Sequence, residues 1–192
     1  MPLVPSHSRA AVSASLSAGA PPASGSRRAA LLALGGCLAL QVSRPVWALE
    51  PAKGKVLLSI SGRIDRANAA GRADFDLAML DALPQHSFVT GTPWFKSARK
   101  FSGPLLRELL AAVGAQGQTL VAVALNDYKV EIPLDDVRRY PVLLATRLDD
   151  EPMRVRDKGP LFIIYPFDAS ADLRSERYYS RSAWQLRHLE LR

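Results

Sequence analysis

Basic and aromatic side chains are the groups in this chain with the clearest capacity for binding chemistry. Arg99, Lys100, Arg107 and Lys158 can line a cleft for an anion, because guanidinium and ammonium groups match phosphate in charge and geometry. A solvated surface position accounts for each of them taken singly. The aromatic residues that can ring a ligand pocket are Tyr128, Tyr165, Phe167, Tyr178, Tyr179 and Trp184. Core packing is the preferred interpretation for the first and last of these.

Several other kinds of chemistry lack a starting residue. The only cysteine is Cys37, and His86 and His188 are far apart, with no carboxylate or cysteine at a metal-ligand spacing. Both histidines are interpreted as ordinary surface or half-buried residues. The chain also has no Gly-x-Ser-x-Gly, phosphate-binding glycine loop, His-Glu-x-x-His or calcium loop. These absences argue against hydrolase, nucleotide-binding and common metalloenzyme functions.

Short strands and a few helices must position these residues. Helices are predicted over 74–83, with a capping Asp, and over 105–113, where Gly114 supplies a left-handed stop. A hairpin is predicted with strands 119–125 and 128–132, its Tyr128, Val130 and Ile132 facing inward. One helical turn is expected over 134–140, and the further predicted strands are 56–60, 88–90, 142–146, 161–165 and 183–191. This pattern predicts an α+β domain.

The polar segment 168–182 is predicted to be a loop. It carries Arg174, Arg177 and Arg181, and it can serve as a lid or as an edge for docking a partner.

Residues 1–48 are predicted to be a cleaved secretory signal peptide. Arg27 and Arg28 precede an apolar run over 29–40, and the segment 46–48 has small residues at the two positions that a signal peptidase reads. The paired arginines resemble the twin-arginine export signal. We therefore expect a periplasmic protein. A minority alternative is a lipoprotein processed at Cys37, because 34–37 loosely resembles such a site.

Composition indicates one folded unit, residues 49–192, and gives no support to nucleic-acid binding. The whole chain has 25 Lys and Arg against 18 Asp and Glu, a net charge of +7. Four of the arginines, and none of the acidic residues, lie in residues 1–48, so the remainder carries only +3. Its charges alternate in sign and form no basic stripe. A chain of this length can bury one sizeable core.

Short motifs follow one another in a fixed order from Lys55 to Leu191. They are the strand 56–62, the segment 80–84, the helix start Phe101-Ser102-Gly103-Pro104-Leu105-Leu106, the hairpin motifs Asn126-Asp127-Tyr128 and Ile132-Pro133-Leu134, the motifs Lys158-Gly159-Pro160-Leu161 and Tyr165-Pro166, and Trp184 before the last strand. In order and spacing they resemble the oxidoreductase molybdopterin-binding domain shared by sulfite oxidase and related periplasmic reductases. The resemblance implies a single compact domain of mixed β-sheet with a few short helices.

This chain departs from the family pattern at the residue that binds the metal. In the enzymes, a cysteine on the segment corresponding to 89–94 supplies a thiolate to molybdenum, and this chain has none there. A threonine hydroxyl is a harder and far less acidic ligand than a thiol. The residues that would border the pocket or hold a cofactor are Thr90, Gly91, Thr92, Trp94, Arg99 and Lys158. A strand-to-loop junction with core aromatics accounts for the first four equally well.

These observations favour a non-catalytic periplasmic ligand-binding or accessory module. It would use the old pocket for a small molecule or present an edge to a membrane-bound sensor or redox partner. The alternative is a molybdopterin-dependent oxidoreductase that holds its metal without cysteine. Whether molybdopterin is bound stays open at this point. A structural domain of unrelated function is the third hypothesis, because fold alone does not fix function.

Overall fold

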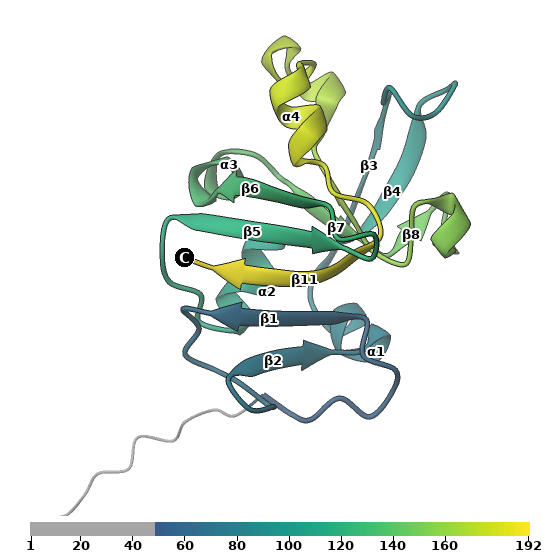
Figure 1. Cartoon of the computed structure of the whole chain (residues 1–192). Coiled ribbons are helices and arrows are strands. Elements are labelled where there is room, and N and C mark those ends of the chain that lie inside the picture. The colour runs from purple at the N-terminus through teal and green to yellow at the C-terminus, as the bar shows by residue number, and fades with distance from the viewer. Residues whose placement is uncertain (1–48) are drawn as a thin grey trace, which may run out of the picture. The chain divides into compact units, whose positions relative to one another are not determined.

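A five-stranded mixed sheet organises residues 49–192, the part of the chain that the computed structural model describes (Figure 1). The predicted signal peptide, with its paired arginines and Cys37, lies outside the described residues. In spatial order the strands are β2 (Arg72–Phe75), β1 (Leu58–Gly62), β11 (Leu186–Leu191), β5 (Thr119–Ala124) and β6 (Lys129–Pro133). Only β1 and β11 run parallel; the other pairs are antiparallel.

Two smaller sheets complete the strand content of residues 49–192. An antiparallel sheet contains β3 (Gln85–Thr90), β4 (Arg99–Pro104), β8 (Arg147–Leu148) and β9 (Glu151–Pro152), and a separate pair joins β7 (Leu143–Ala145) to β10 (Phe162–Ile164). The β3–β4 hairpin extends from the body on the same side as α4 (Figure 1). The predicted α+β fold, with mixed sheet and short helices, is confirmed.

Within residues 49–192, four short α-helices lie among the strands. They are α1 (Leu77–Asp81), α2 (Leu106–Ala112), α3 (Leu134–Arg139) and α4 (Glu176–Arg181), with 3-10 turns η1 (Val155–Asp157), η2 (Phe167–Ala169) and η3 (Ala171–Leu173). Asp76 caps α1 by accepting a hydrogen bond from the Met79 amide at 2.9 Å, and backbone donors including this one lower its pKa. Gly114 ends the α2 region with φ +61°. Among residues 49–192, no helix is long and apolar enough to span a bilayer.

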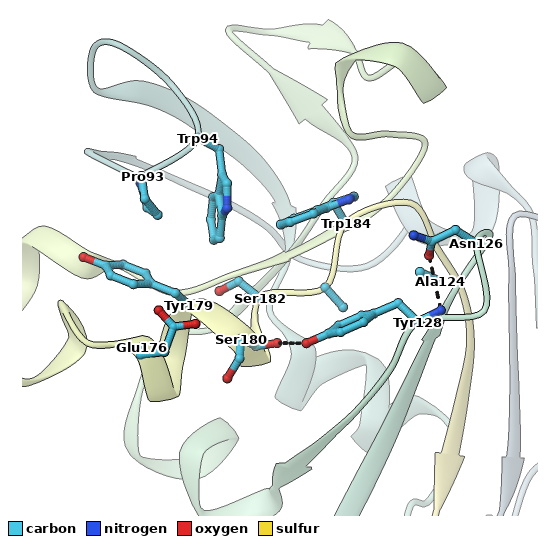
Figure 2. A pocket seen from close by; sticks show the side chains of 11 residues that line it. Pro93, Trp94, Ala124, Asn126, Tyr128, Glu176, Tyr179, Ser180, Ser182 and Trp184 are labelled. Atoms are coloured by element: carbon cyan, nitrogen blue, oxygen red, sulfur yellow. Dashed lines mark hydrogen bonds between the residues drawn. The ribbon is translucent and has the colours of Figure 1, made fainter.

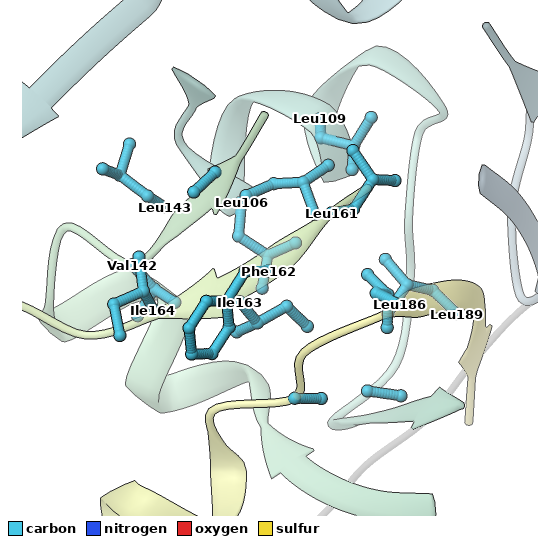
Figure 3. Packing of buried hydrophobic residues seen from close by; sticks show 14 of the residues in the cluster. Leu106, Leu109, Val142, Leu143, Leu161, Phe162, Ile163, Ile164, Leu186 and Leu189 are labelled. Carbon is cyan, nitrogen blue, oxygen red and sulfur yellow. The ribbon is translucent and has the colours of Figure 1, made fainter. Parts of the chain in front are cut away.

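The core is one hydrophobic cluster, and β10 lies at its centre (Figure 3). All three β10 residues, Phe162, Ile163 and Ile164, have no solvent exposure. They are covered by the apolar faces of α2 and β11, which contribute residues such as Leu106 and Leu189. An unbroken apolar strand of this kind is typical of a strand buried on both faces.

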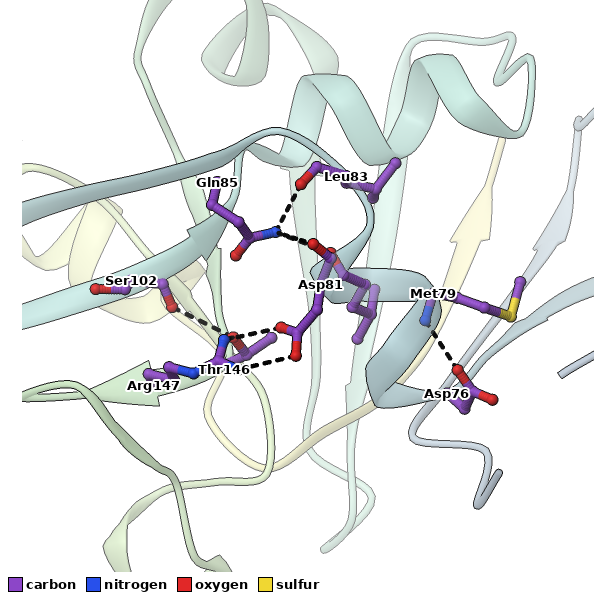
Figure 4. A network of polar contacts seen from close by, with 9 residues as sticks. Asp76, Met79, Asp81, Leu83, Gln85, Ser102, Thr146 and Arg147 are labelled. Carbon is purple, nitrogen blue, oxygen red and sulfur yellow. Dashed lines mark hydrogen bonds and ion pairs between the residues drawn. The ribbon is translucent and has the colours of Figure 1, made fainter. Parts of the chain in front are cut away.

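A bidentate ion pair connects α1 to the four-stranded sheet (Figure 4). The Arg147 guanidinium donates to both carboxylate oxygens of Asp81, at 2.8 Å each. Both side chains are about two-thirds shielded from solvent, and the pairing raises the pKa of Arg147. Gln85 closes the α1–β3 turn by donating to the Leu80 and Leu83 carbonyls.

The structure corrects three local expectations. Asp74 belongs to β2, so the first helix starts later than predicted. Ser102 and Gly103 lie in β4, so they cannot cap α2; the Glu108 carboxylate instead accepts from the Leu105 amide. The Tyr128 side chain does not face inward but is 45% exposed. It sits at the tip of the β5–β6 hairpin, where the turn lifts it out of the sheet.

The segment 168–182 is more regular than the predicted loop. It contains η3 and α4, and the end of η2. Within it, Arg181 is not free, because its guanidinium donates to the buried Asp136 at 2.7 Å. Tyr165 donates to the same carboxylate, and burial raises its pKa.

We expect His188 to make the stability of the fold depend on pH near neutrality. Its Nε2 lies 3.0 Å from the Ser61 Oγ in the centre of the large sheet, and burial lowers its pKa below the ordinary 6.5. The unfolded chain therefore takes up the proton first, and stability present above pH 6.5 is lost as the pH falls through the lower folded-state pKa. The expected result is a lower Tm at about pH 5.5 than at about pH 7.5.

The His188→Gln variant is the control for this effect, since it keeps a hydrogen-bonding side chain but cannot take up a proton in this range. Its Tm should fall less between the two pH values than that of the native protein. An equal fall in both proteins would show that other groups cause the pH dependence.

Candidate functional site

A cavity of about 470 Å³ opens beside the β3–β4 loop, the β5–β6 turn and α4 (Figure 2). Its size lies within the usual range for small-molecule sites, about 300–1,000 Å³. The residues that line it are Pro93, Trp94, Ala124, Asn126, Tyr128, Glu176, Tyr179, Ser180, Ser182, Ala183 and Trp184. Three segments that are distant in sequence therefore meet at one cavity.

Aromatic rings form much of the wall of this cavity. The Trp94 ring centroid lies 5.3 Å from that of Trp184 and 6.1 Å from that of Tyr179, both in edge-to-face geometry. Phe162 and Phe167 support Trp94 from the core at 5.5 and 6.1 Å. Trp94 is therefore packed in part against buried rings of the core, and its contacts join the wall of the cavity to the core.

The polar groups on the lining are mostly uncharged. The Tyr128 hydroxyl donates to the Ser180 carbonyl at 3.0 Å, and the Asn126 side-chain oxygen accepts from the Tyr128 amide at 3.2 Å (Figure 2). Glu176 is the single lining residue with a formal charge at neutral pH. Within residues 49–192 its exposed carboxylate has no salt-bridge partner. The cavity is thus mainly apolar and aromatic, with one negative charge.

A lysine ammonium lies next to the cavity without lining it. Lys158 Nζ is 4.3 Å from the Trp184 ring centroid and 6.0 Å from that of Trp94. Desolvation by burial lowers the pKa of this lysine. The Gln185 amide donates to the Lys158 carbonyl at 2.9 Å, which holds the two segments together.

The segment 90–92 is closed by hydrogen bonds to the protein itself. The buried Thr90 hydroxyl accepts from the Asp168 amide at 3.1 Å, and the Gly91 amide donates to the Asp168 carboxylate at 2.6 Å. The Thr92 hydroxyl accepts from the Trp94 amide at 3.3 Å. These hydrogen bonds therefore fix the end of β3 beside the cavity. The next two residues, Pro93 and Trp94, line the cavity.

The basic residues of the predicted anion cleft are not brought together. Arg99 pairs with Asp149, lowering the pKa of that carboxyl, and its guanidinium lies over Phe95 at 5.3 Å. Lys100 pairs with Asp150 at 2.8 Å, and Arg107 is exposed on α2. Arg99 lines a separate hollow. Of the four, Lys158 alone lies against the aromatic rings of the cavity.

Sequence reasoning missed Glu176 and Asn126 as lining residues. Glu176, Tyr179 and Ser180 have the i, i+3, i+4 spacing that places residues on one helix face, and that spacing was the available signal. Asn126 lies in a hairpin turn, where its residue type is explained by the turn alone. Tyr128, interpreted as a core residue, belongs to the cavity.

The residues at this site do not fit the cofactor that the family resemblance implies. Molybdopterin carries an anionic phosphate, which calls for basic groups, yet no Arg, Lys or His lines the cavity. Molybdenum favours sulfur ligands, and residues 49–192 include no cysteine. Over the same residues, no three His, Asp or Glu side chains gather in a way that could hold a metal ion.

Comparison with known proteins identifies the family. A family profile described as oxidoreductase molybdopterin binding domain matches residues 68–171, more than half of the chain. A comparison with curated proteins finds no match. The matched region contains the β3–β4 hairpin, the β5–β6 hairpin and the turn that carries Lys158. On this match, and on an α+β fold that agrees with it, the chain belongs to the oxidoreductase molybdopterin-binding domain family.

Proposed function

We propose that this chain is an exported, non-catalytic ligand-binding module that takes a small molecule into the aromatic cavity. One observation carries the proposal: the cavity beside the 90–94 segment is walled by aromatic rings and carries one carboxylate, with no sulfur or basic group on its lining. Such a lining suits a ligand held by apolar contact and a few polar groups. It does not suit an anionic metal cofactor.

The proposed location and partner depend on other parts of the chain. Export to the periplasm is supported by the charged and apolar pattern of residues 1–48. A membrane-bound sensor or redox protein is the proposed partner, and α4 with η3 is the proposed docking edge. This docking edge is supported by two exposed arginines, Arg174 and Arg177. Both are within three residues of Glu176, which lines the cavity. Binding in the cavity could then be communicated to the partner through α4.

The competing function is a molybdopterin-dependent oxidoreductase with unusual metal ligation. Metal and pterin analysis of protein purified from periplasm after native export separates the two. By plasma mass spectrometry we expect less than about one-tenth of an equivalent of molybdenum. The fluorescence of oxidised pterin should not exceed the background. Stoichiometric molybdenum together with pterin would establish the enzyme instead.

Installing a thiol on the segment 89–94 should not create metal binding. Thr92→Cys supplies a sulfur ligand, but the lining would still lack basic groups for the cofactor phosphate. The expected molybdenum content of this variant equals that of the native protein. Metal recovered with Thr92→Cys and not with a Thr92→Ser control would show that the pocket is otherwise intact.

A further inference from the structure

We propose that the aromatic cavity binds an organic cation, with a quaternary ammonium group as the simplest example. This inference depends on the proposed ligand-binding function and assigns a ligand class to the same cavity. It follows from three features of the site: the arrangement of its rings, the sign of its only charge, and a lysine that already uses one of the rings.

The rings are arranged as the walls of a cage. Tyr179 and Trp184 each approach Trp94 edge to face, so the three rings present surfaces in different directions around the opening (Figure 2). Tyr128 adds a fourth ring from the hairpin turn, held by its bond to the Ser180 carbonyl. Faces of Trp and Tyr rings attract cations through their quadrupole, and a set of such rings is how proteins recognise alkylated ammonium groups.

The charge of the lining has the sign that a cation requires. The Glu176 carboxylate is the one charged group there, and it has no salt-bridge partner within residues 49–192. Figure 2 shows it beside Tyr179, at the aromatic wall. A bound cation would receive Coulomb attraction from this carboxylate in addition to the ring faces, whereas an anion would be repelled.

Lys158 shows that a cation is stable against this aromatic wall. Its ammonium lies 4.3 Å from the Trp184 ring centroid, although desolvation by burial lowers its pKa. Because Lys158 does not line the cavity, a ligand can bind without replacing it. Its charge would still oppose a second cation nearby. Removing the charge of Glu176 should therefore weaken the binding of a cation, and removing the charge of Lys158 should strengthen it.

The direct test compares choline with 3,3-dimethylbutan-1-ol, in which a neutral carbon replaces the quaternary nitrogen at the same shape. Isothermal titration calorimetry of the exported protein should give at least about tenfold tighter binding for choline, since cation–π attraction adds to the shared apolar contact. Equal affinities would overturn the cation proposal. Equal affinities would still show that the cavity binds a ligand. Failure of the proposed function is a different result, namely molybdenum and pterin in the purified protein.

Charge variants also test whether the ligand is a cation, and one of them is expected to increase the affinity for choline. Glu176→Gln should weaken choline binding about fivefold and leave the neutral alcohol unchanged, and Lys158→Met should strengthen choline binding. Glu151 on β9 is also exposed but lines the separate hollow of Arg99, so Glu151→Gln is the matched control and should change the binding of neither compound. The reverse pattern, with Lys158→Met weakening and Glu176→Gln strengthening binding, would mean an anionic ligand. Absence of binding by both probes would also overturn the proposal.

Discussion

Phe162→Ala is expected to lower the free energy of unfolding by about 3–5 kcal/mol, the usual cost of truncating a buried aromatic side chain. Phe162 has no solvent exposure and lies in β10, at the centre of the core. Its ring is 5.9 Å from that of Phe101, 5.5 Å from that of Trp94 and 6.1 Å from that of Trp184. Alanine would remove the contact that joins the core to the aromatic wall. Equilibrium urea unfolding followed by circular dichroism measures the change.

A surface apolar residue provides the control for this substitution. Val89 is 63% exposed on the neighbouring hairpin, so Val89→Ala should change the free energy of unfolding by less than about 0.5 kcal/mol. A loss below about 1 kcal/mol for Phe162→Ala would mean that the site can collapse around the smaller side chain. In that case Phe162 would not be the support on which Trp94 rests.

Gly103→Ala is expected to destabilise the protein by on the order of 3 kcal/mol, because no space exists for a methyl group there. A Cβ at this position would lie 2.1 Å from the Leu144 carbonyl oxygen and 3.1 Å from the Ala145 Cα. Both atoms belong to the backbone of β7, so a rotamer change cannot relieve the contact. Thermal unfolding should show a clear fall in Tm, or the variant should fail to fold.

Gly91→Ala is the matched substitution. A Cβ there would meet only the Asp168 carboxylate, at an ordinary 3.5 Å, and the backbone is not in the left-handed region. Its Tm should stay within a few degrees of the native value, roughly the shift that corresponds to less than 1 kcal/mol. If the two variants were equally destabilised, the close contact between β4 and β7 would not be the cause.

Local sequence signals predicted most of the fold. The β5–β6 hairpin and α2 were found because a turn dipeptide, a helical apolar face and a glycine stop are each encoded within a few residues. The short strands β2 and β4 were missed where a strand runs directly into a helix. In β4, Ser102, Gly103 and Pro104 resemble a helix start, and pairing with β3 and β8 overrides that local preference.

The candidate site was less predictable than the fold. Trp94 and Lys158 were singled out and do lie at the cavity, because the family resemblance located their segments. Arg99 was grouped with Lys158 by charge, but its partner Asp149 is fifty residues away and draws it to another hollow. Glu176 became a lining residue only through the packing of α4 against the rest of the domain. The spacing of Glu176, Tyr179 and Ser180 marks one face of a helix, but it does not indicate what that face packs against.

The position of β11 in the large sheet sets the order in which the domain can assemble. The ribosome adds this strand after every other element described, yet it lies between β1 and β5 and pairs with both. Until Leu186–Leu191 emerge, β1 and β5 each present an unpaired edge, and exposed edges invite pairing with other chains. The large sheet can therefore be completed only after β11 has emerged, and a chaperone that shields the two edges meanwhile would protect the nascent chain from aggregation.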